Sequence, residues 1–165
     1  MIISLRRLSY DDLKNELKKD DKIVVWACNN CIKFCDGLGG REAMNNLADK
    51  LEADGYTVIR REVIGTSCML DLVQKRKTDE ATADTFKEST VIIPLTCEDG
   101  YENVKYVFND KRVINATKTI GLGVFSTKTG MCINYPFEDT GLEPSIKGIS
   151  LKEAAEKLNL YAGPF

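Results

Sequence analysis

Apolar residues in this chain fall into short continuous runs separated by amphipathic segments. A short continuous apolar run is typical of a strand covered on both faces. Such runs predict strands over residues 22–27 and 90–95, and the segments 56–64 and 112–115 are interpreted as two further strands. Apolar residues at helical spacing, with capping residues at the ends, predict helices over 9–19, 41–54, 67–76 and 101–108. Strand and helix alternate, which favours a mostly parallel sheet with helices on both of its faces.

The C-terminal third shows a different pattern. Two β-prone runs, residues 119–126 and 131–137, flank a short polar turn and predict a hairpin that extends the sheet. Further on, Ser150 and Glu153 are spaced as a capping box and predict a last helix. We therefore predict an α/β protein with a Rossmann-like three-layer fold, in which a mostly parallel sheet of about four to five strands is followed by the hairpin. The length of 165 residues predicts a single domain over 1–165.

Charge and hydropathy exclude several classes of partner. The 23 basic and 25 acidic residues are dispersed along the chain, so no basic surface for nucleic acid is expected. No apolar run approaches the roughly 20 residues that span a membrane. Arg6 and Arg7 are not followed by the apolar stretch of a secretory signal, so we expect a cytoplasmic protein.

Cysteine is abundant and histidine is absent. Six cysteines in a cytoplasmic chain point to metal binding or redox chemistry, because thiols in that compartment are kept reduced. The lack of histidine removes both the commonest metal ligand and the commonest general base. Any metal site must therefore use thiolates or carboxylates.

Three of the cysteines form the strongest motif in the chain. Cys28, Cys31 and Cys35 are spaced C-x2-C-x3-C directly after the apolar run 22–27. Three thiolates within eight residues can hold three corners of an iron-sulfur cluster, which leaves the fourth corner for a distant cysteine. The surrounding Asn29 and Lys33 make this a polar loop, and three cysteines packed only as core residues do not fit it.

Two further cysteines follow predicted strands and are candidates for the fourth ligand. Loops at the carboxyl ends of parallel strands meet at one edge of the sheet. Cys68 follows the second predicted strand and Cys97 follows the third, so both belong to that edge. We favour Cys68, because it is predicted to open a helix whose N-terminus stabilises a thiolate. Cys132, in the hairpin with no cysteine nearby, is interpreted as a packing residue.

Two other chemistries compete with the cluster. A structural zinc site usually takes two C-x2-C pairs, and the chain has only one. A thioredoxin-like dithiol is compatible with Cys28-Asn29-Asn30-Cys31 after a strand. The third cysteine, Cys35, and the late start of the helix at Arg41 speak against it. No carboxylate pair suited to acid–base catalysis stands out.

The cysteine loop also holds glycines and apolar residues with expected roles. Gly39 and Gly40 are predicted to bring the backbone close to the cluster, to supply amide donors to its sulfurs and to turn the chain into the helix. Their spacing with Gly37 does not form a phosphate-binding loop. Phe34 and Leu38 are candidate apolar contacts for a docking partner.

These residues together resemble a known family. The C-x2-C-x3-C motif at Cys28, followed by Gly39-Gly40-x-Glu42 at a helix start, is similar to the MetV-type accessory iron-sulfur subunit, or C-terminal domain, of methylenetetrahydrofolate reductase, in a short form. Cys68, Cys97 and the segment from Val113 to Gly121 resemble later parts of that family. The likeness extends over residues 22–123 and is most specific at the cysteine trio.

The resemblance implies a Rossmann-like fold, a bound 4Fe-4S cluster and electron transfer in anaerobic one-carbon metabolism. The implied partner is a flavoprotein reductase subunit, or else a corrinoid or folate methyl-transfer protein. The chain departs from longer family members because only Cys132 occurs after Cys97, which makes a second cluster unexpected. The implied role is that of an accessory electron-transfer subunit without a catalytic residue of its own.

Overall fold

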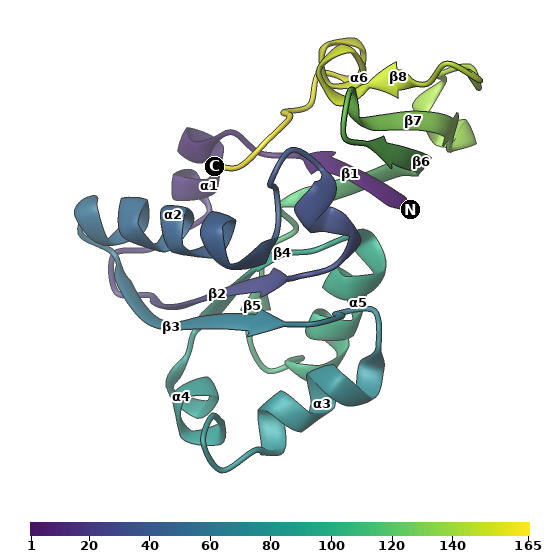
Figure 1. The fold of residues 1–165 in the computed structure, drawn as a ribbon. Coiled ribbons are helices and arrows are strands. Elements are labelled where there is room, and N and C mark those ends of the chain that lie inside the picture. Colours follow the sequence, from purple (N-terminus) through teal and green to yellow (C-terminus); the bar gives the residue numbers. More distant parts are fainter.

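The computed structural model describes residues 1–165 and contains two separate four-stranded sheets. The first sheet is parallel and has the order β3-β2-β4-β5. The second is antiparallel, with the order β1-β6-β7-β8. Figure 1 shows the two sheets lying one above the other, with the chain passing between them. The protein is therefore an α/β protein with one sheet of each kind.

The strands of the parallel sheet follow the predicted apolar runs. They are β2 (Lys22–Cys28), β3 (Thr57–Ile64), β4 (Val91–Leu95) and β5 (Arg112–Val113). Every residue of β4 and all of β2 after Lys22 are buried. This burial on both faces explains why these two strands are continuous apolar runs rather than alternating ones.

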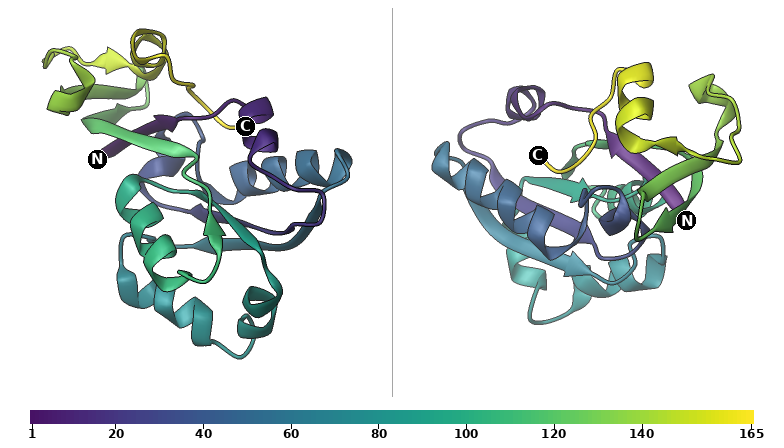
Figure 2. Two further views of the ribbon diagram at one scale, coloured as in Figure 1. Left: turned by 180° about the vertical axis from the view of Figure 1, so that it is seen from behind. Right: turned by 45° about the horizontal axis from the view of Figure 1, so that its top comes forward.

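Helices cover both faces of the parallel sheet (Figures 1 and 2). On one face, α1 (Tyr10–Asn15) and α2 (Gly40–Ala53) contribute Leu13 and Leu47 to a core that includes Val25. On the other face lie α3 (Leu70–Thr78), α4 (Ala83–Glu88) and α5 (Glu98–Val107). Their core centres on Trp26, whose ring centroid lies 6.0 Å from those of both Phe86 and Phe108. None of the helices is long and apolar enough to span a membrane.

The C-terminal hairpin is present but does not extend the parallel sheet, so that prediction is wrong. Its strands are β6 (Thr117–Ser126) and β7 (Gly130–Pro136). β6 pairs with β1 (Ile2–Arg6), and β7 pairs with β8 (Ile149–Ser150). No strand is predicted for the N-terminal residues, although they form β1, which pairs with β6 in the second sheet.

A short core lies on one side of the antiparallel sheet. It contains Ile3 of β1, Ile133 of β7 and Leu151 of the last helix, α6 (Leu151–Leu158). Ser150 caps this helix as predicted, because its hydroxyl accepts a hydrogen bond from the Glu153 N–H. The 3-10 helix η1 (Cys31–Phe34) adds Ile32 to the same core, while η2 (Glu138–Thr140) follows β7. The cysteine loop thus packs against the antiparallel sheet although it begins at the end of a parallel strand.

Candidate functional site

Five of the six cysteines lie in loops at the carboxyl edge of the parallel sheet. Cys28 ends β2, and Cys31 and Cys35 follow it in and after η1. Cys68 follows β3 and Cys97 follows β4. Because β2 lies between β3 and β4 in the sheet, Cys28 is flanked by the two loops that carry Cys68 and Cys97. All of these cysteines are free thiols in the structure.

The Cys28 thiol is held against the loop that follows β3. Its Sγ accepts a hydrogen bond from the Ser67 N–H at 3.4 Å and lies 3.8 Å from the Gly65 carbonyl oxygen. Ser67 is itself fixed, because its Oγ accepts from the Trp26 indole N–H at 3.0 Å and its carbonyl accepts from Asn103 at 3.1 Å. An amide donor on a sulfur stabilises negative charge there, as around metal-bound thiolates.

The Cys35 thiol is held against the first strand of the other sheet. Its Sγ accepts from the Ser4 N–H at 3.5 Å and lies 3.8 Å from the Ile2 carbonyl oxygen, both in β1. It also lies 3.7 Å from the Cys31 carbonyl oxygen. Cys35 therefore joins the cysteine loop to the open edge of β1, while Cys31 remains partly exposed.

Burial and neighbouring thiols raise several cysteine pKa values. Burial is the largest cause for Cys35, whose pKa rises to about 11, with smaller contributions from the charges of Asp36, Cys31 and Cys97. The pKa of Cys97 also rises to about 11, again mainly through burial, and then through Cys68 and other nearby acidic groups. The pKa of Cys68 is raised by burial and next by Cys28. Thiols from all three loops thus affect one another electrostatically.

The two candidates for the fourth ligand differ in their surroundings. Helix α3 begins at Leu70 with Met69 as its N-cap, so Cys68 precedes the helix instead of opening it, and it is exposed. Cys97 is the N-cap of the ten-residue α5 and is buried. The stabilisation by a helix N-terminus that we expected for Cys68 therefore applies to Cys97. Cys68 is therefore the more exposed of the two candidates, and Cys97 is the one that lies at the N-terminus of a helix.

The glycine pair turns the cysteine loop into α2, as the sequence indicated. Gly39 is the N-cap of α2, and a Cβ there would lie 2.4 Å from Cγ2 of Ile32 and 2.8 Å from the Cys28 carbonyl oxygen. Gly40 has a φ of +83°, in the left-handed region that favours glycine. The Gly39 N–H donates to the Ile32 carbonyl oxygen and not to a sulfur, whereas the N–H groups of Ser67 and Ser4 donate to Cys28 and Cys35.

Other predicted contacts divide between the surface and the core. Phe34 is 41% exposed, as a docking contact requires, but Leu38 is buried, so its expected docking role is wrong. Leu38 instead joins the core beneath the antiparallel sheet. Cys132 lies in β7, opposite Val124 and Ser150, and belongs to the other sheet.

Five thiols lie at one edge of the parallel sheet and two of them accept amide hydrogen bonds, so the residues present match an iron-sulfur cluster in donor type and number. No group of three or more Cys, Asp or Glu side chains is arranged in the structure to hold a metal ion. The contact of Ser4 with Cys35 could not be predicted, because no local pattern connects Ser4 to a cysteine 31 positions away. The only feature of the sequence that pointed to Ser67 is its position directly before Cys68.

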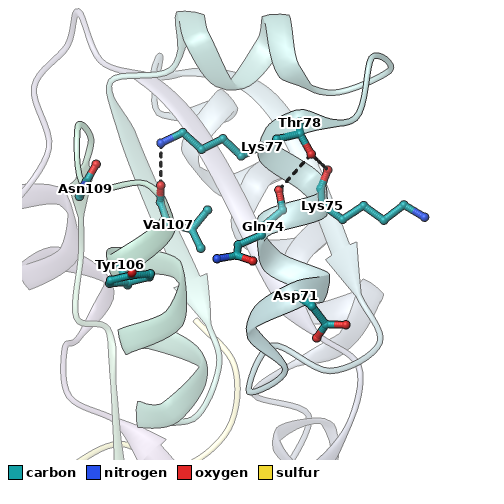
Figure 3. Close-up of a pocket in the computed structure, with 8 residues that line it drawn as sticks. All are labelled: Asp71, Gln74, Lys75, Lys77, Thr78, Tyr106, Val107 and Asn109. Atoms are coloured by element: carbon teal, nitrogen blue, oxygen red, sulfur yellow. Dashed lines mark hydrogen bonds between the residues drawn. The ribbon is translucent and has the colours of Figure 1, made fainter.

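The largest hollow of the surface is separate from this edge. It measures about 630 Å³ and lies between α3 and α5, as Figure 3 shows. No cysteine lines it, and the Lys77 ammonium donates across it to the Val107 carbonyl oxygen at 2.7 Å. In this view Asp71 and Lys75 point away from Tyr106, whereas the Gln74 side chain extends from α3 toward α5.

Comparison with protein-family models, with curated proteins and with solved structures finds no match. The resemblance to the accessory iron-sulfur subunit therefore depends on the quoted residues alone. What the fold and the site define is a class: an α/β protein with a thiol-rich edge on its parallel sheet.

Proposed function

We propose that the carboxyl edge of the parallel sheet holds a 4Fe-4S cluster and that the protein transfers electrons. The observation that carries the proposal is the arrival of five thiols from the loops after three adjacent parallel strands. Cys28, Cys31 and Cys35 would hold three irons, and Cys68 the fourth, with Cys97 as the alternative. A cluster in this position supplies one-electron transfer.

The chain's own groups favour such a cofactor. The N–H groups of Ser67 and Ser4 donate to Cys28 and Cys35, and donors of this kind raise the reduction potential of a cluster by stabilising its reduced, more negative form. The apolar core that contains Cys28, Cys35 and Ile32 restricts access of water from beneath. Gly65, Cys68 and Met69 are exposed on the other side, while Ser67 between them is buried.

A partner has an apolar surface to approach beside the exposed cysteines. Phe34 lies in η1 next to Cys31, and Met69 and Leu70 follow Cys68 directly. All three side chains are among the large apolar residues left exposed. Contact there would bring a redox partner near the cysteines, and the resemblance suggests a flavoprotein reductase subunit of a one-carbon system or a corrinoid or folate methyl-transfer protein.

Anaerobic purification followed by iron, sulfide and zinc analysis tests the cofactor. We expect a brown protein with about four irons and four sulfides per chain, as a cubane cluster requires. A colourless protein with one zinc per chain would replace the proposal with a structural zinc site. Preparation in air is unsuitable, because exposed thiols such as Cys68 oxidise readily.

Rapid mixing tests the function separately from the cofactor. Dithionite-reduced protein, freed of excess reductant, should reduce a flavoprotein encoded beside it, followed by the loss of flavin absorbance. Insulin serves as the control substrate for dithiol chemistry. Fast insulin reduction without flavin reduction would indicate a thioredoxin-like enzyme that uses Cys28 and Cys31.

A further inference from the structure

The antiparallel sheet has one covered face and one bare, apolar face. Cross-strand partners share a face, so Leu122 lies beside Tyr135 and Val124 beside Cys132. Leu122 is 42% exposed, Val124 58% and Tyr135 67%, and Ile146 in the following loop is fully exposed. We call these four residues, Leu122, Val124, Tyr135 and Ile146, the bare face.

The composition of these strands is unusual for a sheet that faces water. Antiparallel sheets with one solvated face normally place polar residues on it. Residues 119–137 contain one charged residue, Lys128 at the hairpin turn, although 29% of the whole chain is charged. The opposite face does not explain this, because its apolar residues, such as Ile133 and Met131, are already buried in the core.

A hollow of the surface adjoins three of the four residues of the bare face. It measures about 250 Å³ and is lined by Val124, Asn134, Tyr135, Pro144, Ser145 and Ile146. Ile146, one of the residues that line this hollow, is fully exposed. In a two-fold interface a projection on one copy meets a hollow on the other, and the same contact occurs twice.

We propose that the bare face is the interface of a homodimer. A permanent interface has an apolar core depleted of charge, whereas brief electron-transfer encounters are small and guided by charge. None of the four side chains is charged, although Glu143 and Lys147 lie in the same loop as Ile146. Its four side chains, at roughly 100 Å² each, offer about 400 Å² of apolar area, close to the apolar share of the roughly 800 Å² that each partner gives to a standard interface.

The proposed dimer does not depend on the proposed cluster, because none of the four residues lies in the loops that carry the candidate ligands. The bare face lies on the sheet shown at the upper right of Figure 1, away from α3 and α4. Dimer formation would cover Tyr135 and Val124 and leave α5 with its exposed Tyr106 free. This difference supplies a matched control.

Sedimentation velocity of the full chain over 1–100 µM (about the range of ordinary dimer constants) tests the interface. We expect a species of twice 18.4 kDa for the wild type. Val124→Lys with Tyr135→Lys should raise the dimer dissociation constant about 100-fold or more, because two charges would be buried without partners. Tyr106→Lys, at an equally exposed tyrosine on α5, should leave it unchanged.

A second variant guards against misfolding of the double mutant. Ile146→Lys changes a side chain that contacts nothing in the single chain, so folding is unaffected and only the interface is weakened. We expect at least a tenfold rise of the dimer dissociation constant, with unchanged circular dichroism. A wild-type monomer at 100 µM, or a dimer that both the double variant and Ile146→Lys leave intact, would overturn the proposal.

Discussion

The two sheets have the same number of strands but differ in what covers them. In the parallel sheet, β2 and β4 are buried on both faces by helices packed against Trp26 and Val25. In the antiparallel sheet, β6 and β7 bury one face against η1 and α6 and leave the other bare. Stability is therefore expected to concentrate in the parallel sheet, and exposed contact area in the antiparallel sheet.

The cysteines lie where the two sheets meet. Cys28 belongs to the end of the parallel strand β2, while Cys35 contacts the backbone of β1 in the antiparallel sheet. Two further hydrogen bonds join the sheets at this place, since Thr119 accepts from the Glu98 N–H and Thr117 donates to the Thr96 carbonyl oxygen. A site at such a junction depends on both sheets being correctly placed.

The largest contrast is expected between core substitutions in the two sheets. Trp26→Ala should lower the free energy of unfolding by about 3–5 kcal/mol, because it removes a fully buried ring packed on Phe86 and Phe108. Tyr135→Ala should change it by less than about 0.5 kcal/mol in dilute, monomeric protein. Urea unfolding at a protein concentration below the dimer dissociation constant measures both. Equal losses would mean that the bare face is packed against its own chain.

A pH effect is expected from Cys35 in metal-free protein. Its folded pKa is raised by burial from about 9 to about 11, so the neutral thiol is favoured in the folded state. The stabilisation contributed by the neutral Cys35 thiol is fully present below pH 9. It falls as the pH rises from 9 towards 11, because this thiol ionises in the unfolded chain before it ionises in the folded protein. The loss attributable to this thiol amounts to at most about 3 kcal/mol. Unfolding at pH 8 and pH 10.5 measures it.

Cys35→Ala is the control for that measurement, since tyrosines and lysines also titrate in this range. The variant should show a smaller loss of stability between the two pH values than the wild type. The same loss in both proteins would contradict the assignment of the effect to Cys35.

Alanine substitutions at Gly39 and Gly65 test how tightly the cysteine loop is packed where the two sheets meet. Gly39→Ala should cost about 1–3 kcal/mol, because the new methyl group would overlap Ile32 and the fixed Cys28 carbonyl oxygen. Gly65→Ala, on the neighbouring loop, has open space around its Cβ and should be nearly neutral. Thermal unfolding of both variants decides the matter, and a harmless Gly39→Ala would show that the loop can relax.

The smallest effect is expected from a hydroxyl that joins the sheets. Thr119→Val keeps the β-branched shape but removes the acceptor of the Glu98 N–H, which lies 2.9 Å from Oγ1, and the contact with the Ser4 hydroxyl. A loss of about 1 kcal/mol in the free energy of unfolding is expected. Thr127→Val in the exposed hairpin turn should cost nothing measurable. Equal values would mean that water replaces the missing acceptor.

Most of the parallel sheet could be predicted from the sequence, because its signals are local. Continuous apolar runs mark β2 and β4, and helical spacing with a terminal glycine marks α2. The same reasoning placed Cys28, Cys68 and Cys97 on one edge, since the carboxyl ends of parallel strands meet there. In each case the residues that mark the feature are adjacent to it in the sequence.

The antiparallel sheet could not be assembled in the same way. Its pairing joins Ile2 to Leu122, and no local pattern specifies a partner 120 residues away. For the same reason the contact between Ser4 and Cys35 was not foreseen, and Leu38 was expected at the surface although η1 packs it beneath β1 and β7. The helix predicted to begin at Ser67 begins at Leu70, so Cys68 lies before the helix N-terminus. The position at a helix N-terminus that was expected for Cys68 belongs to Cys97 instead.

If the cysteines at the carboxyl edge of the parallel sheet hold the cluster, Cys132 in the antiparallel sheet is not needed to bind it. Iron bound per chain after anaerobic reconstitution and desalting, measured for Cys28→Ala beside Cys132→Ala, tests this expectation most directly. We predict that Cys28→Ala retains almost no iron, and that Cys132→Ala retains about four irons per chain, like the wild type. Equal loss of iron in both variants, or full retention in both, would contradict the account.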